Sequence, residues 1–172
     1  PTVTAIKEPI DLAVIAVPAD LVLRTLRDCA KKKIKHLVMV TAGFEETGNL
    51  QLAEHVKDFL KKKKMVMIGP NCLGVFNAHN GVDTLFLPRS RLGRPRPGSI
   101  SFICQSGAVG SAILDLAAYE GYGFAKFASY GNAMIVDESD LLQYFGDDPE
   151  TDVICMYIEG VKDGRKFYET AR

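Results

Sequence analysis

The sequence lacks an excess of charge of either sign, a long apolar run and a close pair of cysteines. Lysine and arginine total 21, against 21 for aspartate and glutamate, so no broad positive field exists to hold a nucleic acid. No apolar stretch approaches the roughly 18 to 20 residues of a membrane span, and the N-terminus shows no basic-then-apolar signal pattern. We therefore expect neither a nucleic acid nor a membrane as a partner.

Cysteine and histidine are sparse, and neither is spaced as in a metal site. The four cysteines are Cys29, Cys72, Cys104 and Cys155. They are far apart, and three lie in or beside apolar runs, which is typical of free thiols in a reducing compartment. The three histidines are His36, His55 and His79. Each is interpreted as structural. We predict a cytoplasmic protein with no metal site of its own.

Short apolar runs alternate with amphipathic helical patterns through the first part of the chain. The 172 residues, 47% of them hydrophobic, suffice for one domain or two small ones. The patterns predict strands at 11–17, 36–40 and 65–68, and helices at 19–33 and 50–64. Short strands with long crossovers favour a parallel sheet wound in the right-handed sense, so this part is predicted to be a Rossmann-type unit.

A second unit is predicted to begin near residue 99. Periodicity disappears between residues 77 and 98, where prolines interleave with arginine and glycine, so this segment is expected to be a linker or a surface excursion. The patterns beyond it predict strands at 99–104, 124–129 and 153–158, and helices at 107–120, 138–146 and past residue 163. This second α/β unit is interpreted as flavodoxin-like, which divides the chain into domains at 1–92 and 93–172.

Both units are expected to be incomplete. The first has no opening βα unit with a glycine-rich turn, and the second stops inside a predicted helix. We therefore expect the chain to be a fragment.

The segment 99–110 carries the clearest functional signal. A buried-strand pattern stops at Gln105-Ser106-Gly107, and a helical pattern begins at once. Ser106 would cap the helix, and the free N–H groups of its first turn, with the positive end of the helix dipole, would hold an anion. An ordinary strand-to-helix turn with a serine cap would give the same pattern.

Two other predicted strand ends carry candidate site residues, because ligands of doubly wound sheets bind beyond the carboxyl ends of the strands. In Gly69-Pro70-Asn71-Cys72-Leu73-Gly74, the proline and glycines suit a ligand-contacting loop, although a purely structural tight turn would also use them. Cys72 is interpreted as a packing or ligand-lining residue, since no basic neighbour or helix dipole is evident to activate it. Glu159 ends an apolar strand, where a carboxylate could contact a reacting group or be merely solvated.

Taken together, five motifs in order resemble one family, and the resemblance covers nearly the whole chain. They are Gly69-Pro70-Asn71-Cys72-Leu73-Gly74, Pro97-Gly98 with Gln105-Ser106-Gly107-Ala108, Gly131-Asn132, Asp148-Pro149-Glu150-Thr151, and the run from Tyr157 to Phe167. The chain is similar to the nucleoside-diphosphate-forming acyl-CoA synthetases. It looks closest to the α subunit or α-like half of ADP-forming acetyl-CoA synthetase, with the succinyl-CoA synthetase α subunit as a more distant relative.

The resemblance implies a fold and a reaction. The fold would be a Rossmann-type CoA-binding domain followed by a flavodoxin-like domain of the succinyl-CoA synthetase type, both incomplete. The reaction would be that of an acid–thiol ligase, which interconverts acyl-CoA, ADP and phosphate with a carboxylic acid, CoA and ATP through an acyl phosphate and a phosphohistidine. ATP and magnesium would belong to an ATP-grasp domain, fused or in a separate β subunit.

The resemblance also assigns roles by position. The CoA pocket would be lined by Val17, Pro18, Thr41, Gly43 and Asn71, with Cys72 beside it. The phosphoryl group would lie on Ser106, Gly107 and Ala108. Glu159 matches the glutamate that pairs with the phosphorylated histidine. That histidine is expected beyond the equivalent of Arg172, and none of the three histidines here matches it.

The sequence departs from the family pattern at Ala133-Met134-Ile135-Val136, where an acidic residue usually precedes the valine. Two other functions are considered. The same domains could form a non-catalytic CoA-binding or regulatory module, for example one fused to an acetyltransferase. A redox Rossmann protein is disfavoured because no G-x-G-x-x-G motif is present. The identity of the carboxylic acid stays open.

Overall fold

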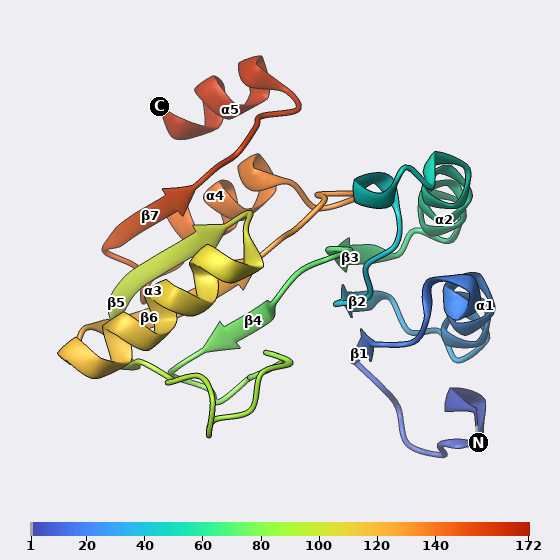
Figure 1. Ribbon diagram of the computed structural model, residues 1–172, viewed down its shortest axis with the longest axis horizontal. Coiled ribbons are helices and arrows are strands. Elements are labelled where there is room, and N and C mark those ends of the chain that lie inside the picture. The colour runs from blue at the N-terminus through green and yellow to red at the C-terminus, as the bar shows by residue number, and fades with distance from the viewer. Residues whose placement is uncertain (1) are drawn as a thin grey trace.

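Two β-sheets lie beside each other in the computed structural model, which describes residues 2–172 (Figure 1). Sheet A is parallel and has the order β1-β2-β3, whereas sheet B has the order β4-β6-β5-β7. The strands of sheet A are β1 (Leu12–Ile15), β2 (His36–Met39) and β3 (Val66–Ile68). Those of sheet B are β4 (Gly74–Asn77), β5 (Arg96–Cys104), β6 (Gly123–Ser129) and β7 (Val153–Tyr157). Neighbouring strands of sheet B are parallel except β4 and β6, which are antiparallel. The predicted α/β fold is confirmed.

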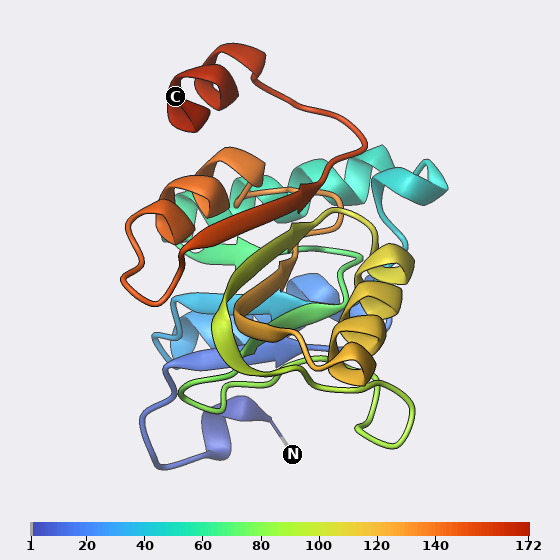
Figure 2. The same ribbon diagram turned by 90° about the vertical axis from the view of Figure 1, so that its left-hand side faces the viewer.

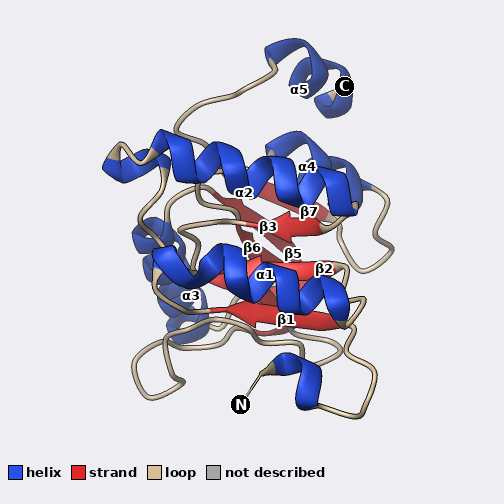
Figure 3. Cartoon of the chain, turned by 90° about the vertical axis from the view of Figure 1, so that its right-hand side faces the viewer, coloured by secondary structure: helices blue, strands red, loops and turns tan. Residues whose placement is uncertain are grey.

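One face of sheet A is covered by two helices, α1 (Val22–Lys31) and α2 (Leu50–Lys63) (Figure 3). Leu26 of α1 and Leu60 of α2 are fully buried, and they pack with Met39 and Met67 of the sheet into one apolar core. Three lysines lie in the last turn of α2 and stabilise the helix, because positive charge at a C-terminus interacts favourably with the helix dipole. There are three short 3-10 turns in the described residues: η1 (Val3–Ala5) lies before β1, η2 (Ala19–Leu21) leads into α1, and η3 (Glu45–Thr47) lies between β2 and α2.

Sheet B is covered on both faces, by α3 (Gly107–Glu120) on one and α4 (Glu138–Gly146) on the other (Figure 2). Alternation along β5 explains this arrangement, since successive side chains of a strand point to opposite faces. Phe102 and Cys104 join the core beneath α3, and Ile103 joins the core beneath α4. A strand buried on both faces reads as a continuous apolar run, which is the pattern found in the sequence.

The bounds of α3 and α4 match the predicted helices, because local capping signals fix both. Ser106 caps α3, and Gly121 ends it in the left-handed conformation. Asp137 and Asp140 form a capping box at the start of α4. The C-terminal helix α5 (Gly164–Ala171) is tied to the same place, because Lys166 Nζ donates to Asp137 Oδ2 at 2.9 Å and to Asp140 Oδ1 at 2.6 Å.

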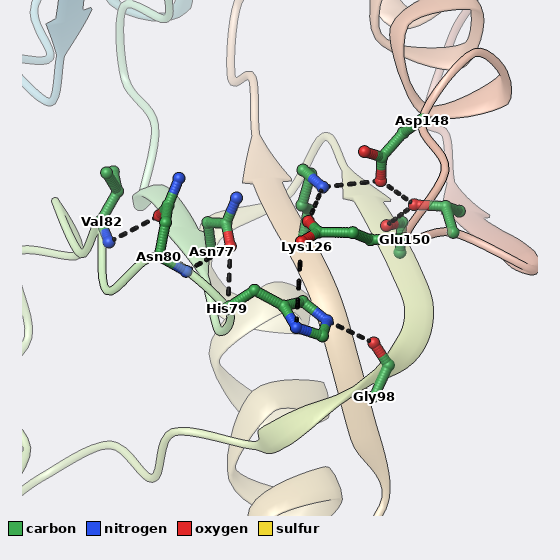
Figure 4. A network of polar contacts seen from close by, with 10 residues as sticks. Asn77, His79, Asn80, Val82, Gly98, Lys126, Asp148 and Glu150 are labelled. Atoms are coloured by element: carbon green, nitrogen blue, oxygen red, sulfur yellow. Dashed lines mark hydrogen bonds and ion pairs between the residues drawn. The ribbon is translucent and has the colours of Figure 1, made fainter.

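A buried lysine organises the loop that precedes β7 (Figure 4). Lys126 Nζ on β6 donates to Asp148 Oδ2 and Glu150 Oε2, both at 2.6 Å. The hydroxyl of Thr151 donates to the same oxygen of Asp148 and lies 2.8 Å from the hydroxyl of Ser101 on β5. Only 9% of the Lys126 side chain is exposed, so the loop with Asp148 and Glu150 neutralises a charge held inside the fold.

Several predicted boundaries were wrong by a few residues. The helix expected at 19–33 opens as the 3-10 turn η2 and ends at Lys31, because Lys33 adopts a left-handed conformation with φ of 65°. Five predicted strands differ from the observed ones by up to two residues at one or both ends. They are 11–17 for β1, 36–40 for β2, 65–68 for β3, 124–129 for β6 and 153–158 for β7. Within residues 2–172, no helix is long and apolar enough to cross a membrane.

The segment expected to lack structure contributes to two strands. β4 was not predicted, because its four residues gain their hydrogen bonds from β6, which is about 50 residues away in the sequence. β5 begins at Arg96, three residues earlier than expected, since Arg96 and Pro97 pair with the start of β6 before a register shift at Pro97/Ile100. β4 lies before the predicted boundary at 92/93 but belongs to the second sheet.

Candidate active site

A cavity of about 910 Å³ lies at the carboxyl ends of strands from both sheets. Most of its lining residues follow β2, β3, β5, β6 and β7, and two come from the segment between β4 and β5. The lining residues are Val40, Ala42, Glu45, Glu46, Asn71, Cys72, Leu73, Phe86, Leu87, Gln105, Ser106, Gly107, Ala108, Ser111, Gly131, Asn132, Glu159 and Lys162. This is the edge at which doubly wound sheets hold their ligands. Six of the ten residues predicted for the site meet here: Asn71, Cys72, Ser106, Gly107, Ala108 and Glu159.

The first turn of α3 forms one wall of the cavity. Ser106 Oγ accepts a hydrogen bond from the Val109 N–H at 3.4 Å, which confirms the predicted cap. The backbone N–H groups of Gly107 and Ala108 belong to the orphan donors that every helix start carries, and α3 is long enough for a developed dipole. A Cβ at Gly107 would meet only ordinary contacts, so packing alone does not demand glycine there. This wall therefore suits an anion.

The turn after β3 forms another part of the cavity wall and touches the turn after β6. A Cβ on Gly131 would collide with the carbonyl oxygens of Pro70 and Asn71, and Gly131 has φ of 55°. Gly131 therefore permits a backbone contact that no side chain would allow. The Asn132 N–H donates to Pro70 O at 3.0 Å, so the two turns are hydrogen bonded as well as packed.

Cys72 lines the cavity but is not an activated thiol. It is buried, its Sγ donates to Met39 O at 3.3 Å, and burial raises its pKa to about 12. A thiol with this pKa is protonated at neutral pH and is a poor nucleophile. The structure thus supports the interpretation of Cys72 as a packing residue on the wall of the cavity.

Glu159 follows β7, and its side chain is exposed at the edge of the cavity. Its carboxylate makes no hydrogen bond to any residue of the described chain, whereas its backbone is fixed. The Glu159 N–H donates to Gln105 Oε1 at 2.8 Å, and the Gly160 N–H donates to the same oxygen at 3.2 Å. A carboxylate so placed can reach a group bound in the cavity without first breaking an internal hydrogen bond.

Charges around the cavity are mostly negative within the described residues: Glu45, Glu46 and Glu159 line it together with a single cation, Lys162. Partial burial acts to raise the pKa of Glu46, but hydrogen bonds from the Gly43 N–H and the Asn132 side chain outweigh it and lower the pKa. Lys162 Nζ donates to the carbonyl oxygens of Asn132 and Ala133, both at 2.8 Å. Its charge is therefore held at the mouth by main-chain oxygens.

The other four residues predicted for the CoA pocket lie outside the cavity, at the ends of β1 and β2. Thr41 is buried, and its hydroxyl donates to Val17 O at 2.7 Å, which ties the turns after these two strands together. Pro18 directly precedes η2, and a Cβ on Gly43 would lie 3.1 Å from the Cβ of Ala19. These residues form a neighbouring part of the same sheet edge, and their contact with CoA stays a prediction.

The three histidines all lie in the described part of the chain, and none of them lines the cavity. His36 Nδ1 lies 3.2 Å from Asp11 O, and His79 Nε2 lies 2.9 Å from Gly98 O, as Figure 4 shows for the latter. Both contacts agree with structural roles. Among residues 2–172, no group of three or more histidine, cysteine or acidic side chains is placed to hold a metal ion.

Sequence reasoning missed six polar residues of the site: Glu45, Glu46, Gln105, Ser111, Asn132 and Lys162. Gln105, Asn132 and Lys162 stood in the quoted motifs without an assigned role, and membership in those motifs was the signal that could have found them. Glu46 gave no signal, because its position depends on the fold of η3 against the second sheet. Asn132 Nδ2 donates to Glu46 Oε2 across 86 residues of sequence.

Two protein-family models match the chain. The model described as a CoA binding domain matches residues 1–78, and the one described as a succinyl-CoA ligase like flavodoxin domain matches residues 97–172. An ADP-forming acetate–CoA ligase of Methanocaldococcus jannaschii is 43% identical over 171 residues, which are 99% of this chain and 24% of that protein. Subunit alpha of the ADP-forming acetate–CoA ligase II of Pyrococcus furiosus is 40% identical over 99% of this chain and 37% of its own length.

Solved structures give the same result. A crystal structure of a Pyrococcus horikoshii protein matches with a TM-score of 0.92 at 40% identity, covering 99% of this chain and 38% of that one. The dinucleotide-forming acetyl-coenzyme A synthetase 1 of Korarchaeum cryptofilum, in complex with phosphate and ADP, matches with a TM-score of 0.91 at 37% identity over 99% of this chain and 36% of its own. The chain thus spans about a quarter to two fifths of the proteins that it matches.

Both sheets, the order of the motifs and these whole-chain similarities agree. The chain belongs to the nucleoside-diphosphate-forming acyl-CoA synthetases, as a CoA-binding unit joined to a flavodoxin-like unit of the succinyl-CoA ligase type.

Proposed function

We propose that this chain forms the CoA-binding and phosphoryl-transfer part of an ADP-forming acid–thiol ligase. The observation that carries the proposal is the shared cavity. The turn with Asn71 and Cys72 comes from the end of sheet A, whereas Ser106 and Glu159 come from the ends of two strands of sheet B, and all four line one space. A CoA thiol, an acyl phosphate and a phosphoryl carrier must meet in such a space for the reaction to occur.

The assigned roles follow from the chemistry of each wall. The N–H groups of Gly107 and Ala108 would hold the phosphoryl oxygens, because orphan donors at a helix start bind such anions well. Glu159 would accept a hydrogen bond from the imidazole of a phosphorylated histidine, which fixes the ring orientation and supports its positive charge. The turns with Val17, Pro18, Thr41 and Gly43 would carry the remainder of CoA along the ends of β1 and β2.

The phosphoryl carrier and the nucleotide would come from elsewhere in the complete protein or from a partner. No histidine lines the cavity among residues 2–172, so the carrier histidine is assigned to a segment or chain outside them. ATP and magnesium are assigned to an ATP-grasp domain or β subunit, as the resemblance to the family implies. The Pyrococcus furiosus relative, named as a subunit alpha, supports a division of this kind. A cytosolic location, predicted from the isolated cysteines, belongs to the same proposal.

Intact-mass spectrometry of the full-length protein tests this function. The protein, with its ATP-grasp partner, is incubated with ATP and magnesium, and the expected product is an acid-labile phosphoryl adduct that a carboxylic acid and CoA discharge. Glu159→Gln should abolish or strongly reduce the adduct, and Glu120→Gln, at the far end of α3, serves as the control. CoA binding without any adduct would overturn the ligase function and favour a non-catalytic binding module.

A further inference from the structure

The side-chain oxygen of Gln105 lies at the meeting point of three hydrogen-bond donors. It accepts from the backbone N–H groups of Glu159 at 2.8 Å and Gly160 at 3.2 Å, and from the buried hydroxyl of Tyr130 at 3.2 Å. The Gln105 backbone N–H donates in turn to Tyr157 O at 3.0 Å. One residue therefore joins the ends of β5, β6 and β7.

The two backbone N–H groups settle how the amide of Gln105 is oriented. Its oxygen must face them, because the opposite orientation would set the NH2 group against two backbone N–H groups, which can only donate. The NH2 group makes no hydrogen bond to any residue between positions 2 and 172, and Gln105 lines the cavity. A neutral acceptor thus holds the loop, and no negative charge is added beside Ser106 or Glu159.

The position of Glu159 depends on the hydrogen bond from its backbone N–H to Gln105, because its carboxylate forms no hydrogen bond with the described residues. Two contacts hold the loop after β7: the Gln105 oxygen at its start, and Lys162, whose Nζ binds Asn132 O and Ala133 O, near its end. Of these, only Gln105 binds the backbone of Glu159 itself. It is also the residue directly before Ser106, so the loop is fixed to the start of the anion-binding turn.

We propose that Gln105 is the positioning residue for Glu159 and sets its distance from the phosphoryl group on the first turn of α3. This inference rests on the proposed function and names how the site is kept in register. Loss of the Gln105 acceptor should free the loop and slow phosphoryl transfer. It should leave phosphate binding largely unchanged, since the N–H groups of Gly107 and Ala108 are untouched.

Two variants of Gln105 separate positioning from general damage. Gln105→Met keeps the length of the side chain but removes the acceptor, whereas Gln105→Glu keeps an acceptor and adds a negative charge. Gln143→Met, on the exposed side of α4, is the matched control. Hydrogen–deuterium exchange of the full-length protein reports on the peptide that contains Glu159 and Gly160, without any need for activity.

In Gln105→Met, exchange at this peptide should be about tenfold or more faster, because two backbone hydrogen bonds are lost. Gln105→Glu should restore the protection. In the assay with the partner, kcat of Gln105→Met should fall about tenfold or more while KM for inorganic phosphate changes little. Gln105→Glu should recover much of kcat but raise KM for phosphate, because its charge repels the anion.

The proposal would be overturned if the peptide with Glu159 and Gly160 exchanged in Gln105→Met at the same rate as in the wild type. It would also be overturned if this peptide exchanged faster but kcat did not change. A wild-type protein that forms no phosphoryl adduct would instead refute the proposed function, and with it the catalytic role of Gln105. The exchange experiment would still show whether Gln105 holds the backbone of Glu159, so the two failures can be told apart.

Discussion

The side-chain amides of Asn71 and Asn132 are hydrogen bonded at 3.2 Å, although 61 residues separate them and each follows a strand of a different sheet. Glu46 extends the link, since its carboxylate accepts from the other end of the Asn132 amide. The two units are therefore joined by side chains at the edge where the cavity lies. These side-chain contacts add to the backbone hydrogen bond from Asn132 to Pro70 in holding the two turns together.

A double-mutant cycle measures this link. Asn71→Ala, Asn132→Ala and the double variant are compared by urea denaturation, and the coupling free energy is expected to be about 0.5–1.5 kcal/mol, the usual net value of one hydrogen bond. Asn71 has φ of 56°, so alanine there carries backbone strain, but the strain enters both arms of the cycle and cancels. Additive effects of the two substitutions would show that the amides do not interact.

Gly131→Ala tests the contact between the turns after β3 and β6. The new Cβ would collide with the oxygens of Pro70 and Asn71 at a positive φ, and the expected loss is about 2–4 kcal/mol in the free energy of unfolding. Gly146→Ala is the control, because a Cβ there meets nothing within 4 Å. Since Gly146 is helical, this control should be neutral or stabilising by up to about 1 kcal/mol. Equal urea midpoints for the two variants would contradict the close approach.

Lys126→Met should be strongly destabilising. Removal of the lysine leaves Asp148, whose side chain is 11% exposed, without its cation, and we expect a loss of about 2–4 kcal/mol. Lys31→Met removes an ion pair with Asp28 in which the lysine side chain is 71% exposed, and it should change stability by less than about 0.5 kcal/mol. Chemical denaturation compares the two. Similar losses would mean that Lys126 is not held as the structure describes.

The same ion pair predicts how stability depends on pH. Burial acts to raise the pKa of Asp148, but Lys126 and Thr151 outweigh it and hold the pKa below its ordinary value of 3.8. For Lys126, burial acts to lower the pKa, but the two carboxylates raise it above 10.5. The stabilisation is therefore complete between these values, falls as pH drops through the folded pKa of Asp148, and falls as pH rises through that of Lys126.

Urea denaturation across acid and alkaline pH checks this dependence. Wild type and Lys31→Met should lose stability at both extremes, whereas Lys126→Met should show shallower declines, because its remaining carboxylates have no lysine to pair with. Parallel curves for all three proteins would contradict the assignment.

Cys72 is expected to be unreactive and dispensable for chemistry. Of the four cysteines, Cys155 alone is not buried, so at about pH 8 iodoacetamide should modify it well before Cys72, whose thiol has a pKa of about 12. Peptide mass spectrometry of timed samples measures the order. Cys72→Ser, which keeps a donor for Met39 O, should still form the phosphoryl adduct. Loss of the adduct in this variant would make Cys72 a reacting group after all.

Local signals allowed much of the fold to be predicted. The helices at 107–120 and 138–146 were correct because Ser106, Gly121 and Asp137 mark their ends in the sequence. β4 could not be found in this way, since its four residues become a strand only by pairing with β6. Nearest-neighbour patterns carry no information about such a partner.

The residues of the candidate site also fall into those that the sequence predicted and those that only the structure shows. Ser106 and Glu159 were found because each follows a strand pattern directly, and their meeting at one cavity was expected from the fold class. The roles of Gln105 and Lys162 were not found, because both depend on hydrogen bonds to backbone groups of other strands and turns. A backbone acceptor or donor leaves no mark in the sequence, so only the structure shows these contacts.

The position of β4 limits where this protein can be truncated or its units exchanged. The strand precedes the apparent junction of the two units, yet it covers an outer strand of the second sheet. A truncated protein that started after residue 78 would leave β6 with a bare edge, which is a template for aggregation. Gene fusions or domain exchanges in this family should therefore carry that short strand with the second unit.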